Sequence, residues 1–309
     1  MALDDATSGF LAQMAETGQP PLHEMEPEQA RGMTAMLKDM YGDGPEVARS
    51  ELIQVPAQGR TIPVRVLVPH DEARGVVVYY HGGGWVIGAI DEFEALGRQL
   101  ADRTGCAVAL VDYRLAPEHP YPAAVDDAWD ALVWVDRNVE KICGKRVPLI
   151  VAGDSAGGNL AAVVSRKARD SDIALAQQVL VYPVTDCDFD TASYTDPENQ
   201  LMLSRDSMIW FWNHYAPAGT RENPDASPAR ALDLTGLPPA VVLTAEHDVL
   251  RDEGQAYAEA LEKAGVPVSH RRFAGQMHGF FTMVNLLPGS EQGISYVVDE
   301  IDERLRAIS

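Results

Sequence analysis

Apolar residues occur along much of this chain in short continuous runs that do not alternate with polar residues. Runs of this kind span residues 76–80, 106–113, 148–153, 177–183 and 239–246. An apolar run without alternation is typical of a strand that is buried on both faces. Between the runs, apolar residues recur at helical spacing over 94–105, 123–139, 157–170 and 252–265. This regular exchange predicts a mostly parallel sheet with helices on both faces.

The segments at either side of this core complete the predicted domain. Residues 51–57 and 61–69 alternate around a short turn and predict an antiparallel hairpin. A last strand is expected over 268–273 and a last helix over 292–307. Together these give an α/β fold with a central eight-stranded sheet, in a single catalytic domain over residues 46–309. Residues 1–45 are expected to be a helical cap segment, with helical spacing over 28–42 that ends at Gly42.

The regular alternation of predicted strands and helices is interrupted at about residues 187–225. This stretch begins with loop-forming residues and continues into an aromatic helical patch at 208–215. Long insertions are usually functional or disordered, and the aromatic residues argue against disorder. We therefore predict a cap insertion, or lid, over 187–225.

Composition narrows the classes of function. The chain has 309 residues, 46% of them hydrophobic and 23% charged, which is typical of a globular protein. Its net charge of −21 argues against nucleic acid as a partner. Three widely spaced cysteines predict neither a disulfide framework nor a zinc site. The N-terminal residues lack a signal-peptide pattern and no apolar run reaches 18 residues, so we expect a cytoplasmic protein with no membrane contact.

A serine nucleophile is indicated by residues 153–157, which read G-D-S-A-G. The pattern lies between a predicted strand and a predicted helix, as a nucleophile elbow requires. The turn leaves no room for a side chain two residues before or two residues after Ser155, so both of these positions, 153 and 157, are glycine. Serine needs a base and an orienting acid, which should follow it along the chain in the order acid, then histidine.

Of the four histidines after Ser155, His278 is the best candidate for the base. It follows the last predicted strand and precedes a glycine, whereas His270 lies inside that strand. For the acid we favour Asp248, in the loop after the strand that ends near residue 246. Asp252 fits better as a residue of the first helical turn. The remaining candidates are weaker, namely His214 in the lid, His247 beside Asp248, and Glu246.

The stretch H-G-G-G-W at residues 81–85 predicts an oxyanion hole. Backbone N–H groups that converge on an oxyanion need a loop without Cβ atoms in the way. We expect Gly83, Gly84 and Ala156 to donate, Gly82 to form the turn, and His81 to brace the loop. A further scaffold is expected over residues 112–124, where Arg114 would pair with Asp112 or Asp154.

The lid supplies candidate substrate-binding residues. They are Met202, Leu203, Trp210 and Phe211, to which Trp85 is added as pocket wall or packing. Core packing of the lid helix explains the same residues equally well. No metal or cofactor is expected, and the expected partner is a small-molecule ester.

Five ordered motifs between about residues 75 and 280 resemble one known family. They are HGGGW, DYRLAPEHPYPAA, GDSAGGNLAA, HDVLRDEG and MHGF. Together they resemble the hormone-sensitive-lipase-like family of bacterial carboxylesterases, in its GDSAG branch. The resemblance implies an α/β-hydrolase fold with a cap, and serine-esterase activity on short- to medium-chain esters. It also implies catalytic roles for Ser155, Asp248 and His278. One departure is Val249, where the acid motif of the family commonly has proline.

Two alternatives from other classes remain. Gly82, Gly84 and Gly88 follow a strand, and Asp112 ends the next one, which approaches the layout of an NAD(P)-binding oxidoreductase. A non-catalytic ligand-binding protein on a hydrolase scaffold is the other. The natural ester, amidase or aryl-diester activity, and the choice between a monomer and a homodimer through the last strand are left open.

Overall fold

Eight strands form one sheet in the computed structural model, which describes residues 2–36 and 38–308. Their order across the sheet is β1-β2-β4-β3-β5-β6-β7-β8. The strands are β1 (Arg49–Ala57), β2 (Arg60–Val68), β3 (Val76–Tyr80), β4 (Ala107–Val111), β5 (Leu149–Asp154), β6 (Leu175–Val181), β7 (Ala240–His247) and β8 (Val268–Met277). Strand β2 runs antiparallel to both β1 and β4, whereas β3 to β8 are parallel. The predicted hairpin and mostly parallel eight-stranded sheet are confirmed.

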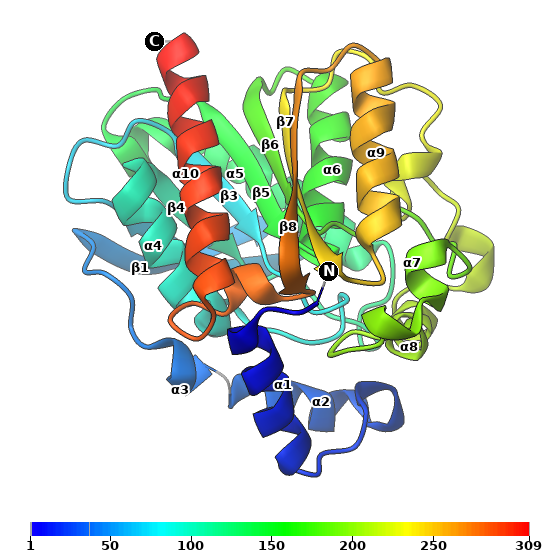
Figure 1. The fold of residues 1–309 in the computed structure, drawn as a ribbon. Helices are drawn as coiled ribbons and strands as arrows, with labels where there is room; N and C mark the ends of the chain where they lie inside the picture. The colour runs from blue at the N-terminus through cyan, green and yellow to red at the C-terminus, as the bar shows by residue number, and fades with distance from the viewer. Residues whose placement is uncertain (1, 37, 309) are drawn as a thin grey trace.

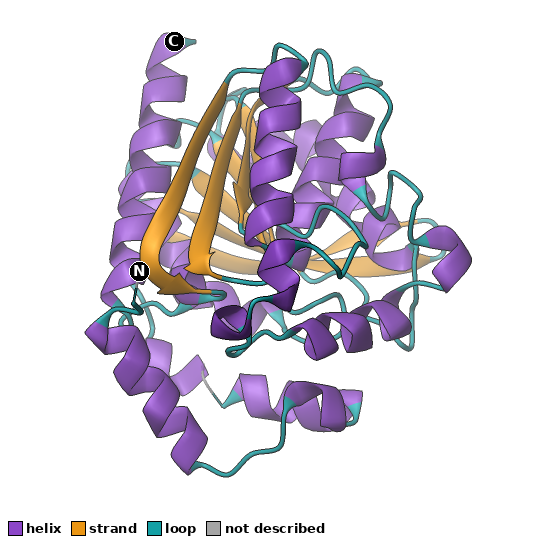
Figure 2. Cartoon of the chain, turned by 45° about the vertical axis from the view of Figure 1, so that its right-hand side comes forward, coloured by secondary structure: helices purple, strands orange, loops and turns teal. Residues whose placement is uncertain are grey.

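Helices cover both faces of the sheet (Figure 2). Helices α4 and α10 pack on one face, and α5, α6 and α9 pack on the other. The helices are α1 (Asp5–Glu16), α2 (Pro27–Ala35), α3 (Lys38–Tyr41), α4 (Glu94–Thr104), α5 (Ala123–Cys143), α6 (Ala156–Arg169), α7 (Ala192–Thr195), α8 (Arg205–Tyr215), α9 (Arg251–Lys263) and α10 (Pro288–Ala307). Short 3₁₀ turns are found at Leu22–Glu24, Ile90–Phe93, Pro197–Asn199, Ala218–Thr220, Pro228–Arg230 and Phe280–Thr282.

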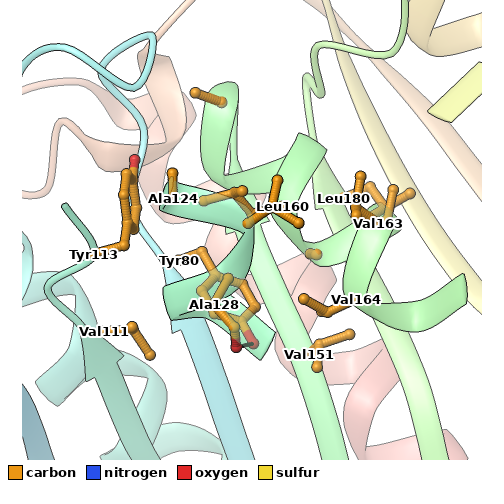
Figure 3. Packing of buried hydrophobic residues seen from close by; sticks show 14 of the residues in the cluster. Tyr80, Val111, Tyr113, Ala124, Ala128, Val151, Leu160, Val163, Val164 and Leu180 are labelled. Atoms are coloured by element: carbon orange, nitrogen blue, oxygen red, sulfur yellow. Dashed lines mark hydrogen bonds between the residues drawn. The ribbon is translucent and has the colours of Figure 1, made fainter. Parts of the chain in front are cut away.

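Each central strand contributes to two separate apolar layers. In β3, Val78 and Tyr80 belong to one layer, and Val77 and Tyr79 belong to the other. All four side chains are buried, which explains why the strand shows no polar alternation. Figure 3 shows the first layer, in which the Tyr80 hydroxyl donates a 3.0 Å hydrogen bond to the carbonyl oxygen of Ala128. Burial of one such valine stabilises the fold by about 1.5–3 kcal/mol.

The carboxyl ends of the parallel strands point toward helices α1, α2, α7 and α8, which gather at that end of the molecule (Figure 1). The predicted N-terminal helical segment, residues 1–45, contains helices α1, α2 and α3, and α3 ends at Tyr41, directly before Gly42. Leu37 lies outside the described residues. Helix α1 is held at its start by Asp4, whose Oδ1 accepts a 2.6 Å hydrogen bond from the N–H of Thr7.

The prediction that Arg114 pairs with Asp112 or Asp154 was wrong. Its Nε and Nη2 donate to the two carboxylate oxygens of Asp127, at 2.8 and 2.9 Å. Asp127 also accepts a 2.6 Å hydrogen bond from Arg60 and is 1% exposed, so its charge is compensated twice. Asp127 lies one helical turn into α5. It comes close to Arg114 only because α5 packs beside the loop after β4. The ion pair therefore fastens the hairpin edge and this loop to α5.

This network predicts a difference between two neighbouring acids. Asp127→Ala should lower the free energy of unfolding by about 2 kcal/mol, because Asp127 is an acceptor for the side chains of Arg60 and Arg114 and also for the backbone N–H of Arg114. Asp130→Ala removes a half-exposed partner of Arg60 and should cost about 0.5 kcal/mol or less. Urea denaturation of both variants measures the difference. Equal losses would contradict the assigned role of Asp127.

Candidate active site

Ser155 occupies a sharp turn between strand β5 and helix α6. Its backbone has φ 56° and ψ −117°, a conformation that residues other than glycine rarely adopt. The N–H of Ser155 donates a 2.8 Å hydrogen bond to the carbonyl oxygen of Val181, which holds the turn against β6. The side chain is thereby presented at the carboxyl edge of the sheet.

The two glycines that flank the serine are required by close packing. A Cβ at Gly157 would overlap the carbonyl oxygen of Tyr80, and one at Gly153 would overlap the carbonyl group of Gly157. Strand β3, strand β5 and helix α6 meet here with no space for side chains. The structure therefore gives the same reason for both glycines as the sequence does, namely that there is no space for a side chain.

His278 lies between Ser155 and Asp248. Its Nε2 is 3.0 Å from the Ser155 Oγ, and its Nδ1 is 2.8 Å from Asp248 Oδ2. Asp248 follows β7 and His278 follows β8, so two neighbouring strands deliver both residues to the same edge. The Asp248 side chain is fully buried, and its Oδ1 accepts a 2.9 Å hydrogen bond from the N–H of Leu250. The three residues selected from the sequence are thus brought together.

The weaker histidines lie elsewhere. His270 is inside β8, where its Nε2 is 3.0 Å from the Thr244 hydroxyl. His214 packs edge-on against the Trp210 ring in α8, and His247 is a buried residue at the end of β7.

The weaker acids have structural partners. Asp252 lies in the first turn of α9 and accepts a 2.8 Å hydrogen bond from the N–H of Ser193. Glu246 accepts a 2.7 Å hydrogen bond from the N–H of Gly275. Both therefore join neighbouring segments to the strand ends.

Asp154 connects the serine turn to the glycine loop. Its Oδ1 accepts hydrogen bonds from the N–H of Gly82 at 2.9 Å and from the Tyr79 hydroxyl at 2.8 Å. Burial raises the pKa of this carboxyl to about 6, although the hydrogen bonds act in the opposite direction. Sequence reasoning considered Asp154 only as a partner for Arg114 and missed this link. Its place directly before Ser155, in a motif otherwise made of small residues, was the available signal.

His81 is buried under the glycine loop. Its Nδ1 is 2.7 Å from the Gly82 carbonyl oxygen, and its ring stacks on Tyr113 with centroids 4.3 Å apart. Burial lowers the pKa of His81 to about 4, so the ring is neutral at pH 7. Its contacts are those of a residue that braces the loop, as expected.

Helix α8 packs directly on the glycine loop. A Cβ at Gly84, where φ is +56°, would overlap the ring of Phe211. Within the described residues, no protein acceptor takes the N–H groups of Gly83 and Gly84. Ala156 is the first residue of α6, so its N–H also lacks a partner within the helix. These three N–H groups are available to a ligand.

A cavity of about 360 Å³ opens at Ser155 and His278. Of the predicted substrate-binding residues, Met202, Leu203 and Phe211 line it. Two of the residues predicted to line it do not. Trp85 is completely buried, stacked on Tyr215 with ring centroids 4.0 Å apart, and it packs the loop rather than the cavity wall. Trp210 packs edge-on against Phe211 and is also outside the lining.

The N-terminal segment contributes a wall that sequence reasoning did not specify. The lining from this segment and from the turn after the glycine loop is Met14, Thr17, Gln19, Pro20, Pro21, Leu22, Met33, Thr34, Tyr41, Glu92 and Phe93. Helical spacing alone indicates which residues are buried, and it does not distinguish a core from a cavity wall. No signal in the sequence singled these residues out.

No cluster of three or more His, Cys, Asp or Glu residues is arranged to hold a metal ion within residues 2–36 and 38–308. Cys106, Cys143 and Cys187 are free thiols. None of the helices in these ranges is long and apolar enough to cross a membrane.

Comparison with known proteins gives a consistent result. A family model described as an alpha/beta hydrolase fold matches residues 77–282. The chain is 41% identical over 276 residues to the carboxylesterase NlhH of Mycobacterium tuberculosis, covering 81% of this chain and 86% of that protein. It is 33% identical to an ethyl acetate hydrolase of Pseudomonas putida, covering 99% of this chain and all of that protein.

Solved structures agree with these sequence relatives. The fold superimposes on a hyperthermophilic esterase from the archaeon Pyrobaculum calidifontis with a TM-score of 0.91. The two chains are 38% identical, and the match covers 100% of each.

The buried His81 predicts a measurable pH effect. Its native pKa of about 4 lies below the ordinary value of 6.5, so the unfolded chain binds a proton here before the native chain does. This site should therefore lower the stability as pH falls from about 6.5 toward 4. An NMR titration of the His81 imidazole, assigned with His81→Gln, should give a midpoint below 5. A midpoint near 6.5 would contradict the burial argument.

Proposed function

Because this chain belongs to the hormone-sensitive-lipase-like family of α/β-hydrolases and hydrolyses carboxylic esters, we propose that Ser155, His278 and Asp248 carry out that reaction. The observation that supports these roles most directly is the position of His278, in hydrogen-bond reach of both other residues. The comparisons support neither a dinucleotide-dependent oxidoreductase nor a non-catalytic binding protein.

Ser155 is the nucleophile and His278 is the general base. The carboxylate of Asp248 accepts a hydrogen bond from Nδ1–H of the imidazole, which leaves Nε2 unprotonated and facing the serine hydroxyl. As Ser155 Oγ attacks the ester carbonyl carbon, its proton moves to Nε2. The buried charge of Asp248 then stabilises the imidazolium that forms.

The N–H groups of Gly83, Gly84 and Ala156 stabilise the negative charge on the former carbonyl oxygen. Backbone donors suit this task because they are held rigidly and need no reorganisation as charge develops. Loss of one such donor typically costs about 3 kcal/mol of transition-state stabilisation. Asp154 orients this loop relative to Ser155 through its hydrogen bond to Gly82.

The remaining steps complete a balanced hydrolysis. His278 gives its proton to the departing alkoxide, the C–O bond breaks, and the acyl group stays on Ser155. A water molecule then attacks the acyl-enzyme while His278 accepts one of its protons. The second tetrahedral intermediate collapses, His278 returns the proton to Ser155, and the carboxylic acid leaves.

Residues 1–45 and 187–225 form the cap in this proposal. Met202, Leu203 and Phe211 from the insertion, together with Met14 and Met33 from the N-terminal segment, line the cavity beside Ser155. This mostly apolar surface supports short- to medium-chain esters as substrates.

The location and assembly of the protein stay predictions. The free thiols of Cys106, Cys143 and Cys187 support a cytoplasmic location. A monomer and a homodimer that pairs through the edge strand β8 are both compatible with the sheet order.

Replacement of Ser155 tests the nucleophile. Ser155→Ala should reduce hydrolysis of p-nitrophenyl butyrate by roughly a million-fold, since the acyl-enzyme no longer forms. The measurement needs a preparation free of host esterase. A different protein without esterase activity, purified in the same way, provides this check. Retained turnover in this variant would falsify the assignment.

Two acids after β7 provide a matched test of the third residue. Asp248→Asn should lower kcat by about ten-thousand-fold, because the amide no longer holds the productive tautomer of His278. Asp252→Asn alters only the contacts of this side chain with Ser193 and Arg251, and it should retain most of the activity. Steady-state kinetics on one ester compares both variants. A larger loss from Asp252→Asn would reverse the choice of acid.

A further inference from the structure

The charge of the cavity wall is entirely acidic. Among the described residues, those lining the cavity include the carboxyl side chains of Glu92 and Asp154, and no lysine or arginine. The whole chain carries a net charge of −21, so the surrounding field has the same sign. A substrate that enters this cavity therefore meets two carboxyl groups and no lysine or arginine among the described lining residues.

The two carboxyl groups are used differently. Asp154 accepts hydrogen bonds from Gly82 and Tyr79 and thereby holds the glycine loop. Glu92 forms no ion pair with any lysine or arginine of residues 2–36 and 38–308, and the side-chain partner found for it is the Thr34 hydroxyl. The nearby Lys38 instead pairs with the exposed Asp91, at 3.8 Å. Glu92 is thus a cavity-lining acid without a counterion in the part of the chain that the structure describes.

Glu92 lies in the 3₁₀ turn Ile90–Phe93, which connects the glycine loop to α4. Its side chain is half-buried, and the rings of Phe93 and Tyr41 line the same cavity. Aromatic faces beside a carboxylate are a favourable setting for an organic cation, because both attract positive charge. The fold therefore places an unpaired acid and two aromatic rings in the wall of the cavity that contains Ser155.

We propose that Glu92 is a specificity-determining residue that favours esters carrying an alkylammonium group and disfavours esters carrying a second carboxylate. This inference rests on Ser155 being the nucleophile of the same cavity. Glu92 touches the substrate arm at a distance from the reacting carbonyl, so it changes which ester is preferred and leaves the chemistry of neutral esters intact.

The protonation of Glu92 makes the preference depend on pH. Burial raises its pKa to about 7, and Asp112 acts in the same direction, whereas the Thr34 hydroxyl and Lys38 lower it. Tyr41, whose own pKa is raised by burial and by Glu92, is neutral in this range. Glu92 is therefore uncharged well below pH 7 and carries its full charge above it. The preference for a cationic ester should increase with pH through this range.

The test uses pairs of esters that differ only in charge. Choline butyrate and 3,3-dimethylbutyl butyrate place a trimethylammonium or a tert-butyl group on the alcohol. Phenyl 4-(trimethylammonio)butanoate and phenyl 5,5-dimethylhexanoate do the same on the acyl chain. For at least one pair, Glu92→Gln should reduce the cationic-to-neutral ratio of kcat/KM by about tenfold, which corresponds to about 1.4 kcal/mol. Its kcat/KM for the neutral esters should stay within about twofold.

Asp91→Asn is the matched control, because Asp91 is the adjacent acid but lies outside the cavity lining. It should leave the ratio unchanged. Above about pH 6.5 the wild-type ratio should rise with pH, and the ratio for Glu92→Gln should change less, because Asp154, with a pKa of about 6, titrates in both proteins.

Two results would overturn this inference. One is an unchanged ratio for both pairs in Glu92→Gln, and the other is an equal loss in Asp91→Asn. Failure of the proposed nucleophile would look different, since Ser155→Ala would then retain turnover of the neutral esters.

Discussion

One close approach of backbone to backbone supports the active site, between the turn that carries Ser155 and the end of strand β3. Gly157 lies so near the Tyr80 carbonyl that any side chain there would overlap it. The turn holds Ser155 in a sparsely populated backbone conformation, which costs roughly 1–3 kcal/mol. Buried elements on both sides, β5 and α6, compensate for that cost. The close packing of the core around this turn keeps the Ser155 side chain at the carboxyl edge of the sheet.

Asp154 extends this constraint from the serine turn to the glycine loop. One of its carboxylate oxygens accepts hydrogen bonds from Gly82 and from Tyr79. The residue before the proposed nucleophile therefore also positions the loop that supplies the proposed oxyanion donors. A buried acid is costly in general, and these two bonds offset part of that cost. The two halves of the site are joined by a single side chain.

The insertion between β6 and β7 has two roles in this arrangement. Phe211 covers the glycine loop and lines the cavity, whereas Trp212 and Tyr215 pack around Trp85 beneath it. Helix α8 consequently supports the loop and also forms the roof of the cavity. The N-terminal segment and the 3₁₀ turn at Glu92 complete the wall, so chain segments far apart in sequence together decide which ester arm fits.

The sequence by itself determined the sheet, its edge hairpin, and the residues proposed for catalysis. Continuous apolar runs specify buried strands. Ser155 and Asp248 each follow such a run and His278 follows the last predicted strand, so parallel topology brings them to one edge. Only the tertiary structure decided the contacts between separate segments. It paired Arg114 with Asp127, turned Trp85 into the core, and left Glu92 facing the cavity without a lysine or arginine partner among the described residues. Local patterns record which residues are buried, whereas the partner of a side chain depends on how distant segments pack.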